Sequence, residues 1–236
     1  MRIYHGTTSR HLESVLKDGL KPRGDTPSIW DAASNPDLVY LTKVYAMHFA
    51  GNAAMQSESG DAMLIELDSD LFPDQHELLA DEDAIAGAMM KGAIPKPAFA
   101  DYDSRTEPHD LARRIANDLE KWSYEGADAD WSLRVIGNCT YKGVIPPEAI
   151  TRIVTYDAET NWWIGFHDPV ISIANFRFVG DELAQSQMVL FGRLEEAEAA
   201  KTMFPTAYAL SSLSEYVMKH RTGMWDRVDG KLVKVV

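Results

Sequence analysis

The apolar residues of this chain come in short runs, and the length of these runs limits what the chain can fold into. The three clearest runs, at residues 2–5, 38–42 and 62–68, read as strands. Segments with helical spacing lie between them, for example at 44–55. No run approaches the roughly 20 apolar residues that a helix needs to cross a bilayer. The alternation predicts a mixed α/β domain, and we expect no membrane span.

The rest of the chain continues this mixture. The further elements that the pattern predicts are a helix capped by Thr8 or Ser9, helices over 78–90 and 109–122, two or three strands within 132–157, and a strand pair or extended segment within 169–180. From residue 181 onward helix formers dominate, and no linker or internal repeat separates the two parts. We therefore expect a domain over residues 1–180 and a helical C-terminal extension over 181–236 that packs on it.

Three consecutive carboxylates, Asp81, Glu82 and Asp83, lie at the acidic start of the predicted helix over 78–90. Negative charge is favourable at the positive end of a helix dipole. Neighbouring residues on a helix point in different directions, so the three carboxylates are poorly placed to share one cation. We interpret them as charges that stabilise the helix terminus, and we expect no metal site.

The composition restricts the compartment and the partners. The chain has 236 residues, of which 45% are hydrophobic, and this is enough for one sizeable core. Its one cysteine, Cys139, cannot form an intrachain disulfide, and no signal peptide is apparent, so we expect a cytoplasmic protein. The net charge of −13 disfavours non-specific binding of nucleic acid, because phosphates are repelled at long range. A local basic patch stays open as an alternative, although its candidate residues are scattered along the chain.

No generic catalytic motif is present: the sequence has no phosphate-binding loop, no dinucleotide fingerprint, no paired CxxC and no nucleophile elbow. What stands out is His5-Gly6-Thr7 at the end of the first predicted strand. Tyr40 lies near the end of the second, and a helix rich in small residues follows it. The alternative is that His5 is a turn histidine bonded to local backbone and that Tyr40 is a core aromatic residue.

This order of residues resembles the ADP-ribosyltransferase superfamily, in its diphtheria-toxin and poly(ADP-ribose) polymerase branch. The resemblance implies an α+β fold, a split β-sheet sandwich with helices, in which NAD binds in a cleft between two small sheets. In that family the His hydrogen-bonds the adenosine ribose, the backbone of the following Gly holds the nicotinamide amide, and the Tyr stacks on the nicotinamide ring. The residues that the resemblance assigns to NAD, as co-substrate, are His5, Gly6, Thr7, Tyr40 and Thr42.

The third motif of that family is a Glu that starts a later strand, and here the matching position is Asn138. The family Glu hydrogen-bonds the nicotinamide ribose and stabilises a transition state with oxocarbenium character. Asn can hold the hydroxyl but brings no charge. The resemblance thus implies a catalytic set of His5, Tyr40 and Asn138. The nearby carboxylates that could replace the Glu are Glu125, Asp128 and Asp130, whereas Glu148 matches a structural position of the family.

The function that the resemblance implies is mono-ADP-ribosyl transfer from NAD to an acceptor, which could be a protein, a nucleic acid or a small molecule. The loops at 21–37 and 92–108 would select this acceptor. Three alternatives stay open. The chain could be a weak or inactive NAD-binding module, which Asn138 favours. It could be an RNA 2′-phosphotransferase-like enzyme, for which Arg2 and Arg10 flank His5. It could also belong to a phage or toxin system and dock a protein partner on its C-terminal helices.

Overall fold

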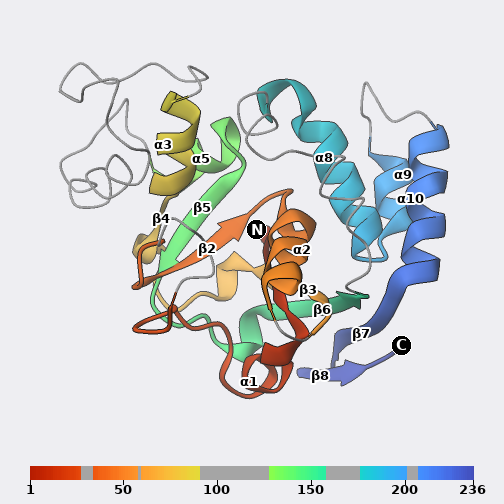
Figure 1. Ribbon diagram of the computed structural model, residues 1–236, viewed down its shortest axis with the longest axis horizontal. Helices are drawn as coiled ribbons and strands as arrows, with labels where there is room; N and C mark the ends of the chain where they lie inside the picture. The colour runs from red at the N-terminus through yellow and green to blue at the C-terminus, as the bar shows by residue number, and fades with distance from the viewer. Residues whose placement is uncertain (28–33, 58–59, 91–127, 158–175, 201–206) are drawn as a thin grey trace.

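The computed structural model describes residues 1–27, 34–57, 60–90, 128–157, 176–200 and 207–236. They form a sheet with helices packed against both faces (Figure 1). The predicted helix over 109–122 and the loop at 92–108 lie outside the described residues. Within the described ranges, no helix is both long enough and apolar enough to cross a bilayer.

The strands of the described residues make one antiparallel sheet in the order β4-β5-β2-β1-β3-β6-β7-β8. Their bounds are β1 Arg2–Thr8, β2 Leu38–Thr42, β3 Ala62–Asp68, β4 Leu78–Ala80, β5 Asn138–Lys142, β6 Ile150–Tyr156, β7 Arg221–Val228 and β8 Lys231–Lys234. The strands predicted over 38–42 and 62–68 are confirmed. β1 is longer than predicted, because β3 pairs with it from Arg2 to Thr8 and so keeps Gly6 and Thr7 in the strand.

The sheet is almost divided between β1 and β2. These two strands share a single residue pair, Tyr4 with Thr42, which we call the joint. On either side the pairing is complete: β2 pairs with β5 along its whole length, and β1 does the same with β3. The α+β class is therefore confirmed. The expectation of two small sheets is corrected, since two blocks of strands, β4-β5-β2 and β1-β3-β6-β7-β8, meet at the joint.

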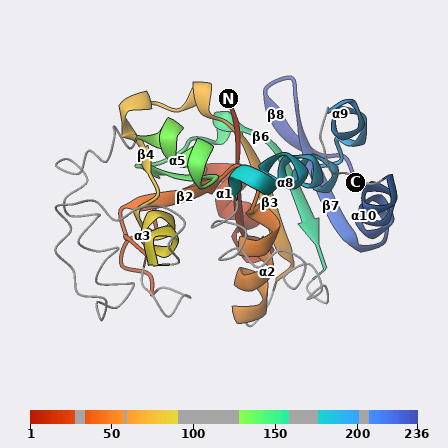
Figure 2. The same cartoon turned by 90° about the horizontal axis from the view of Figure 1, so that it is seen from above.

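Helices cover both faces of the sheet and bury two cores (Figure 2). Their bounds are α1 Leu12–Asp18, α2 Ala46–Gln56, α3 Glu82–Met90, α5 Ala129–Val135, α8 Phe176–Leu190, α9 Leu194–Ala199 and α10 Ala207–His220. α1 and α5 bury Val15 and Leu133 against one face, together with Ile65 of β3. α2, α8, α9 and α10 pack on the opposite face against β1, β3 and β6. The two cores hold the sheet between helix layers.

Three segments differ from the sequence prediction. Residues 132–135, read as strand, belong to α5, because Asp128 caps this helix by accepting a hydrogen bond from the backbone N–H of Trp131 at 2.8 Å. Residues 176–180, also read as extended, are the first turns of α8. Residues 78–80, read as helix, form β4, because they pair with β5.

The C-terminal region is helical only as far as His220, so the expectation of a wholly helical extension is wrong. β7 and β8 follow, and β7 pairs with β6 from Arg152–Asp226 to Tyr156–Arg221. β6 is buried on its core side and would otherwise end the sheet with unpaired backbone groups. The expected boundary at residue 180 lies inside α8.

Candidate functional site

His5 and Tyr40 meet beside the joint, although 35 residues separate them in the chain. The Nδ1 of His5 lies 2.8 Å from the backbone carbonyl oxygen of Tyr40. A carbonyl oxygen only accepts, so Nδ1 carries the proton, and in the neutral ring Nε2 is then an acceptor. Burial lowers the pKa of His5, and the nearby His11 lowers it further, so the ring is neutral at physiological pH. His5 thus bridges β1 to β2 where the ladder between them has ended.

The phenol of Tyr40 is held at its hydroxyl by two other segments. The hydroxyl oxygen accepts a hydrogen bond from the backbone N–H of Asn35 at 2.9 Å. The hydroxyl proton is donated to Oε1 of Glu82, at the start of α3. Burial raises the pKa of Tyr40, and the carboxylates of Asp83, Glu82 and Asp81 raise it further, so the phenol stays protonated. The ring is therefore fixed from both sides of its hydroxyl.

The carboxylates at the start of α3 do more than complement the helix dipole. Asp81 is buried and caps the helix, accepting from the backbone N–H of Ala84 at 2.8 Å. Glu82 is 1% exposed, and its Oε2 has no hydrogen-bond partner. Burial raises the pKa of Glu82 to about 7. The local pattern indicates only the helix terminus, because the partner of Glu82, Tyr40, lies 42 residues away in the chain.

Asn138 begins β5 directly opposite Thr42, and the next pair on this face of the strands is Tyr40 with Thr140. Side chains two residues apart on a strand share a face, so Asn138 and Tyr40 are diagonal neighbours on one face. Asn138 is 2% exposed, and its Oδ1 has no hydrogen-bond partner. A buried acceptor without a donor is rare in proteins and marks a place where a ligand or water can donate.

The remaining predicted ligands have structural partners of their own. Thr42 Oγ1 accepts from the backbone N–H groups of Val44 at 3.2 Å and Tyr45 at 2.9 Å, so its hydroxyl is used to start α2. Gly6 is required by packing, because a Cβ atom at this position would lie 2.0 Å from the carbonyl oxygen of Ala46 in α2. Thr7 is partly exposed and lies two residues beyond His5, on the same face of β1.

The carboxylates considered as substitutes for the family Glu are not gathered at Asn138. Asp128 is exposed and serves as the cap of α5. Asp130 and Glu148 are also exposed. Glu125 lies outside the described residues. The buried carboxylate that does contact a predicted site residue is Glu82.

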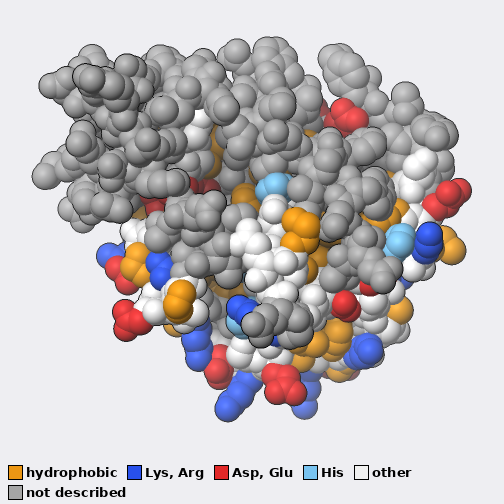
Figure 3. Space-filling view, viewed as in Figure 1, with side chains coloured by type: hydrophobic (Ala, Val, Ile, Leu, Met, Phe, Trp, Pro, Cys, Tyr) orange, Lys and Arg blue, Asp and Glu red, His pale blue; other side chains and the backbone are white. Residues whose placement is uncertain are grey.

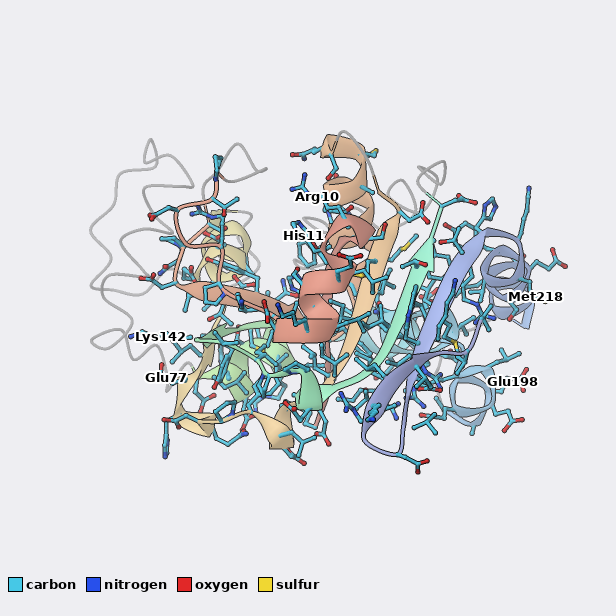
Figure 4. The ribbon with its side chains drawn as sticks, turned by 90° about the horizontal axis from the view of Figure 1, so that it is seen from below. Arg10, His11, Glu77, Lys142, Glu198 and Met218 are labelled. Atoms are coloured by element: carbon cyan, nitrogen blue, oxygen red, sulfur yellow. The ribbon has the colours of Figure 1, made fainter. Side chains whose placement is uncertain are left out.

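The basic residues near His5 do not form one cluster. Arg2 donates to Glu196 at 2.8 Å and lies 3.4 Å from Glu66, so acidic partners engage its charge. Arg10 instead donates to Nε2 of His11 at 3.0 Å, and Figure 4 shows the two side chains together. Over the described part of the face drawn in Figure 3, Lys and Arg are interspersed with Asp and Glu. These observations do not favour the phosphate grip that the phosphotransferase alternative needs.

Comparisons with known proteins do not show a family for this chain. No protein-family model matches the sequence, and no curated protein matches it. Among solved structures, the chain is similar to one named EcPltA, with 13% sequence identity and a TM-score of 0.34. The match covers 66% of this chain and 75% of the other. At this level the similarity carries no argument about fold or activity.

Proposed function

We propose that this protein is a mono-ADP-ribosyltransferase, which takes ADP-ribose from NAD, passes it to an acceptor and releases nicotinamide. The observation that carries the proposal is the hydrogen bond from the His5 ring to the backbone carbonyl of Tyr40, which joins strands from different blocks at the point where their pairing stops. Beyond Tyr4, β1 has no strand paired to its β2 side within the described residues. A carboxamide needs one donor and one acceptor, and a strand edge without a paired strand presents both kinds of backbone group.

Groups on both faces of the sheet near the joint match the parts of a nicotinamide riboside: the pairing of Tyr4 with Thr42 puts Tyr40 and Asn138 on the face of Tyr4, and His5 on the other face. The Tyr40 ring offers an aromatic face to a flat pyridinium cation. The neutral His5 ring offers Nε2 as an acceptor for a ribose hydroxyl, and the buried Oδ1 of Asn138 offers a second one. Nicotinamide leaves as a neutral group, so the work of the protein is to orient the ribose and to support the positive charge that develops on it.

Not every residue that the resemblance assigns keeps its proposed role. Thr42 uses its hydroxyl within the fold, and the Cα side of Gly6 faces α2. The backbone of Gly6 can still bond a ligand, and Thr7 has its hydroxyl on the His5 face of β1. We therefore base the proposal on His5, Tyr40 and Asn138, with Gly6 and Thr7 as the supporting residues.

Incubation of the protein with NAD labelled in the nicotinamide ring tests the proposal. We expect free labelled nicotinamide to appear, with a rate that falls at least about tenfold in Tyr40→Ala and in His5→Ala, because each removes a direct contact. Lys21→Ala, which removes an exposed ion pair with Asp18, is the matched control and should leave the rate unchanged. An absence of both NAD binding and nicotinamide release in the unaltered protein would contradict the proposal.

A non-catalytic NAD-binding module is the second candidate, and the amide at Asn138 is the observation that favours it. Calorimetry separates the two functions. Binding of NAD that is lost in Tyr40→Ala, together with no release of nicotinamide, would indicate a binding module. Release that increases in Asn138→Glu would show that the missing charge limits an active enzyme.

A further inference from the structure

Glu82 is almost fully buried, whereas a carboxylate at the start of a helix is usually exposed to solvent. It is 1% exposed, it receives one hydrogen bond from Tyr40, and its second oxygen has no partner. Among the described residues, no Lys, Arg or His forms an ion pair with it. A buried carboxylate without a cation is costly, so its retention at this place calls for a use.

The contact with Tyr40 decides where the ring lies. Tyr40 extends from β2, Asn35 lies in the loop before β2, and Glu82 begins α3. The three segments converge on one hydroxyl group, which is donor to Glu82 and acceptor from Asn35. A ring fixed in this way is ready to stack on a ligand without first losing rotational freedom.

The distribution of charge in the proposed site also indicates a role for Glu82. The amide of Asn138 is neutral, although the proposed reaction develops positive charge near it. Glu82 is the buried carboxylate in contact with a proposed site residue, and it lies at the outer end of the Tyr40 ring. Its field reaches a cation on that ring through protein rather than through water, and it is therefore weakly screened.

We propose that Glu82 is a positioning residue of the nicotinamide site, which fixes the Tyr40 ring through its hydroxyl and supplies the negative charge that Asn138 lacks. The inference rests on the proposed function and deepens it. Glu82 acts through the phenol and does not touch the reacting atoms. A carboxylate that accepts from the hydroxyl makes the ring more electron-rich, and the attraction of its face for a pyridinium increases.

The groups around Glu82 set the pH at which this effect appears. Asp81 and Asp83 are its neighbours in sequence: Asp83 raises the pKa of Glu82 by repulsion, and burial, together with repulsion by Glu82 and Asp83, raises the pKa of Asp81. Tyr40 on β2 and Cys139 on β5 have raised pKa values, so both stay neutral. Asp130 on α5 acts on Cys139 rather than on Glu82. Since the pKa of Glu82 is about 7, its charge grows as the pH rises through neutrality, and affinity for the pyridinium cation grows with it.

Calorimetric titration with NAD from about pH 6 to pH 8 tests the inference on the full chain. In the unaltered protein, we expect the affinity to increase about tenfold across this range, as one buried charge forms. Glu82→Gln keeps the acceptor oxygen and removes the charge, so its affinity should stay low and nearly constant with pH. Glu198→Gln, which neutralises an exposed residue of α9, is the matched control and should follow the unaltered protein.

Two further variants keep the test decisive. Tyr40→Phe loses the hydrogen bond and keeps the Glu82 charge, so it should bind NAD more weakly and retain the pH dependence. Without NAD, the losses of melting temperature in Tyr40→Phe and Glu82→Gln should not add up in the double variant, because both affect one contact. A Glu82→Gln variant with unaltered affinity and pH profile would overturn this inference alone. An unaltered protein that does not bind NAD would overturn the proposed function and this inference with it.

Discussion

At the scale of single residues, Gly6 shows how a position can serve packing and chemistry at once. It lies in β1 between His5 and Thr7, and α2 crosses so closely that a Cβ atom would lie 2.7 Å from the backbone nitrogen of Ala50. The absent side chain allows α2 to pack on the strand that carries His5. The family resemblance assigns Gly6 to a ligand, and the packing of α2 requires a glycine at this position even without a ligand.

We expect Gly6→Ala to destabilise the fold by about 3 kcal/mol, because the new methyl group overlaps backbone atoms of α2 that cannot rotate away. Chemical denaturation followed by circular dichroism measures this. Gly87→Ala is the matched control: this glycine lies within α3 with no atom within 4 Å of the added Cβ. The control should raise the free energy of unfolding by roughly 0.5–1 kcal/mol. Equal effects of the two substitutions would contradict the packing argument.

At the scale of elements, a buried carboxylate ties α9 to the sheet. Glu66 of β3 is fully buried, and its Oε2 accepts from Nε of Arg193 at 2.8 Å. Its Oε1 accepts from the hydroxyl of Thr151 in β6 at 2.7 Å and from Nη2 of Arg193. Hydrogen bonds from the guanidinium to both carboxylate oxygens satisfy the buried charge. The pKa of Arg193 is raised, chiefly by the hydrogen bond with Glu66, so the guanidinium stays charged.

Arg193→Met should cost about 3 kcal/mol, because it removes both guanidinium hydrogen bonds to the buried Glu66 and leaves only the longer contact with Arg2 at 3.4 Å to balance the charge. The double variant Glu66→Leu and Arg193→Met should recover most of this loss, since no buried charge remains. Lys21→Ala, which breaks the exposed pair with Asp18, should change stability by less than about 1 kcal/mol. Urea denaturation of the unaltered protein and the three variants measures these changes. A loss in Arg193→Met as small as that in Lys21→Ala would show that water reaches Glu66.

How far the sequence predicted these elements depends on what surrounds them. β2 and β3 are buried on both faces, so a continuous apolar run in the sequence was enough to predict each strand. The apolar residues Leu133, Val135 and Ile136 are typical of a strand. The segment is helical instead, because Asp128 caps α5. β7, between β6 and β8, has mixed burial, and its polar residues interrupt the apolar pattern that would have predicted a strand. The Tyr40–Glu82 contact joins distant segments, and no local pattern could have shown it.

At the scale of the whole molecule, the last strands of the chain complete the sheet that its first strands begin. β7 and β8 follow three helices and pair onto β6 and β7 respectively, while α8, α9 and α10 share a core with α2. The segment from α8 to the end of β8 thus contributes both a helix layer and strands to the block that contains His5. The region is part of the same folding unit as β1, β3 and β6.

A chain that ends at His220 should lose cooperative thermal unfolding and aggregate, because the backbone edge of β6 and the residues beneath β7 become exposed. A chain that ends at Val228 is the control. It lacks β8 but keeps the ladder between β6 and β7, and we expect it to unfold cooperatively at a reduced melting temperature. Circular dichroism and size-exclusion chromatography distinguish the two. Cooperative unfolding of the shorter chain at the full-length temperature would show that the strands are an appendage.

The single pair that joins the two blocks of strands has one more consequence. A ladder normally passes the twist of each strand to the next, so a change at one end of a sheet spreads through its hydrogen bonds. Here that transmission is interrupted at Tyr4 and Thr42. Insertions or substitutions that reshape β4, β5 and α3 can therefore accumulate without shifting the register of β1 on β3. During evolution, one side of the proposed site can change while the other side is preserved.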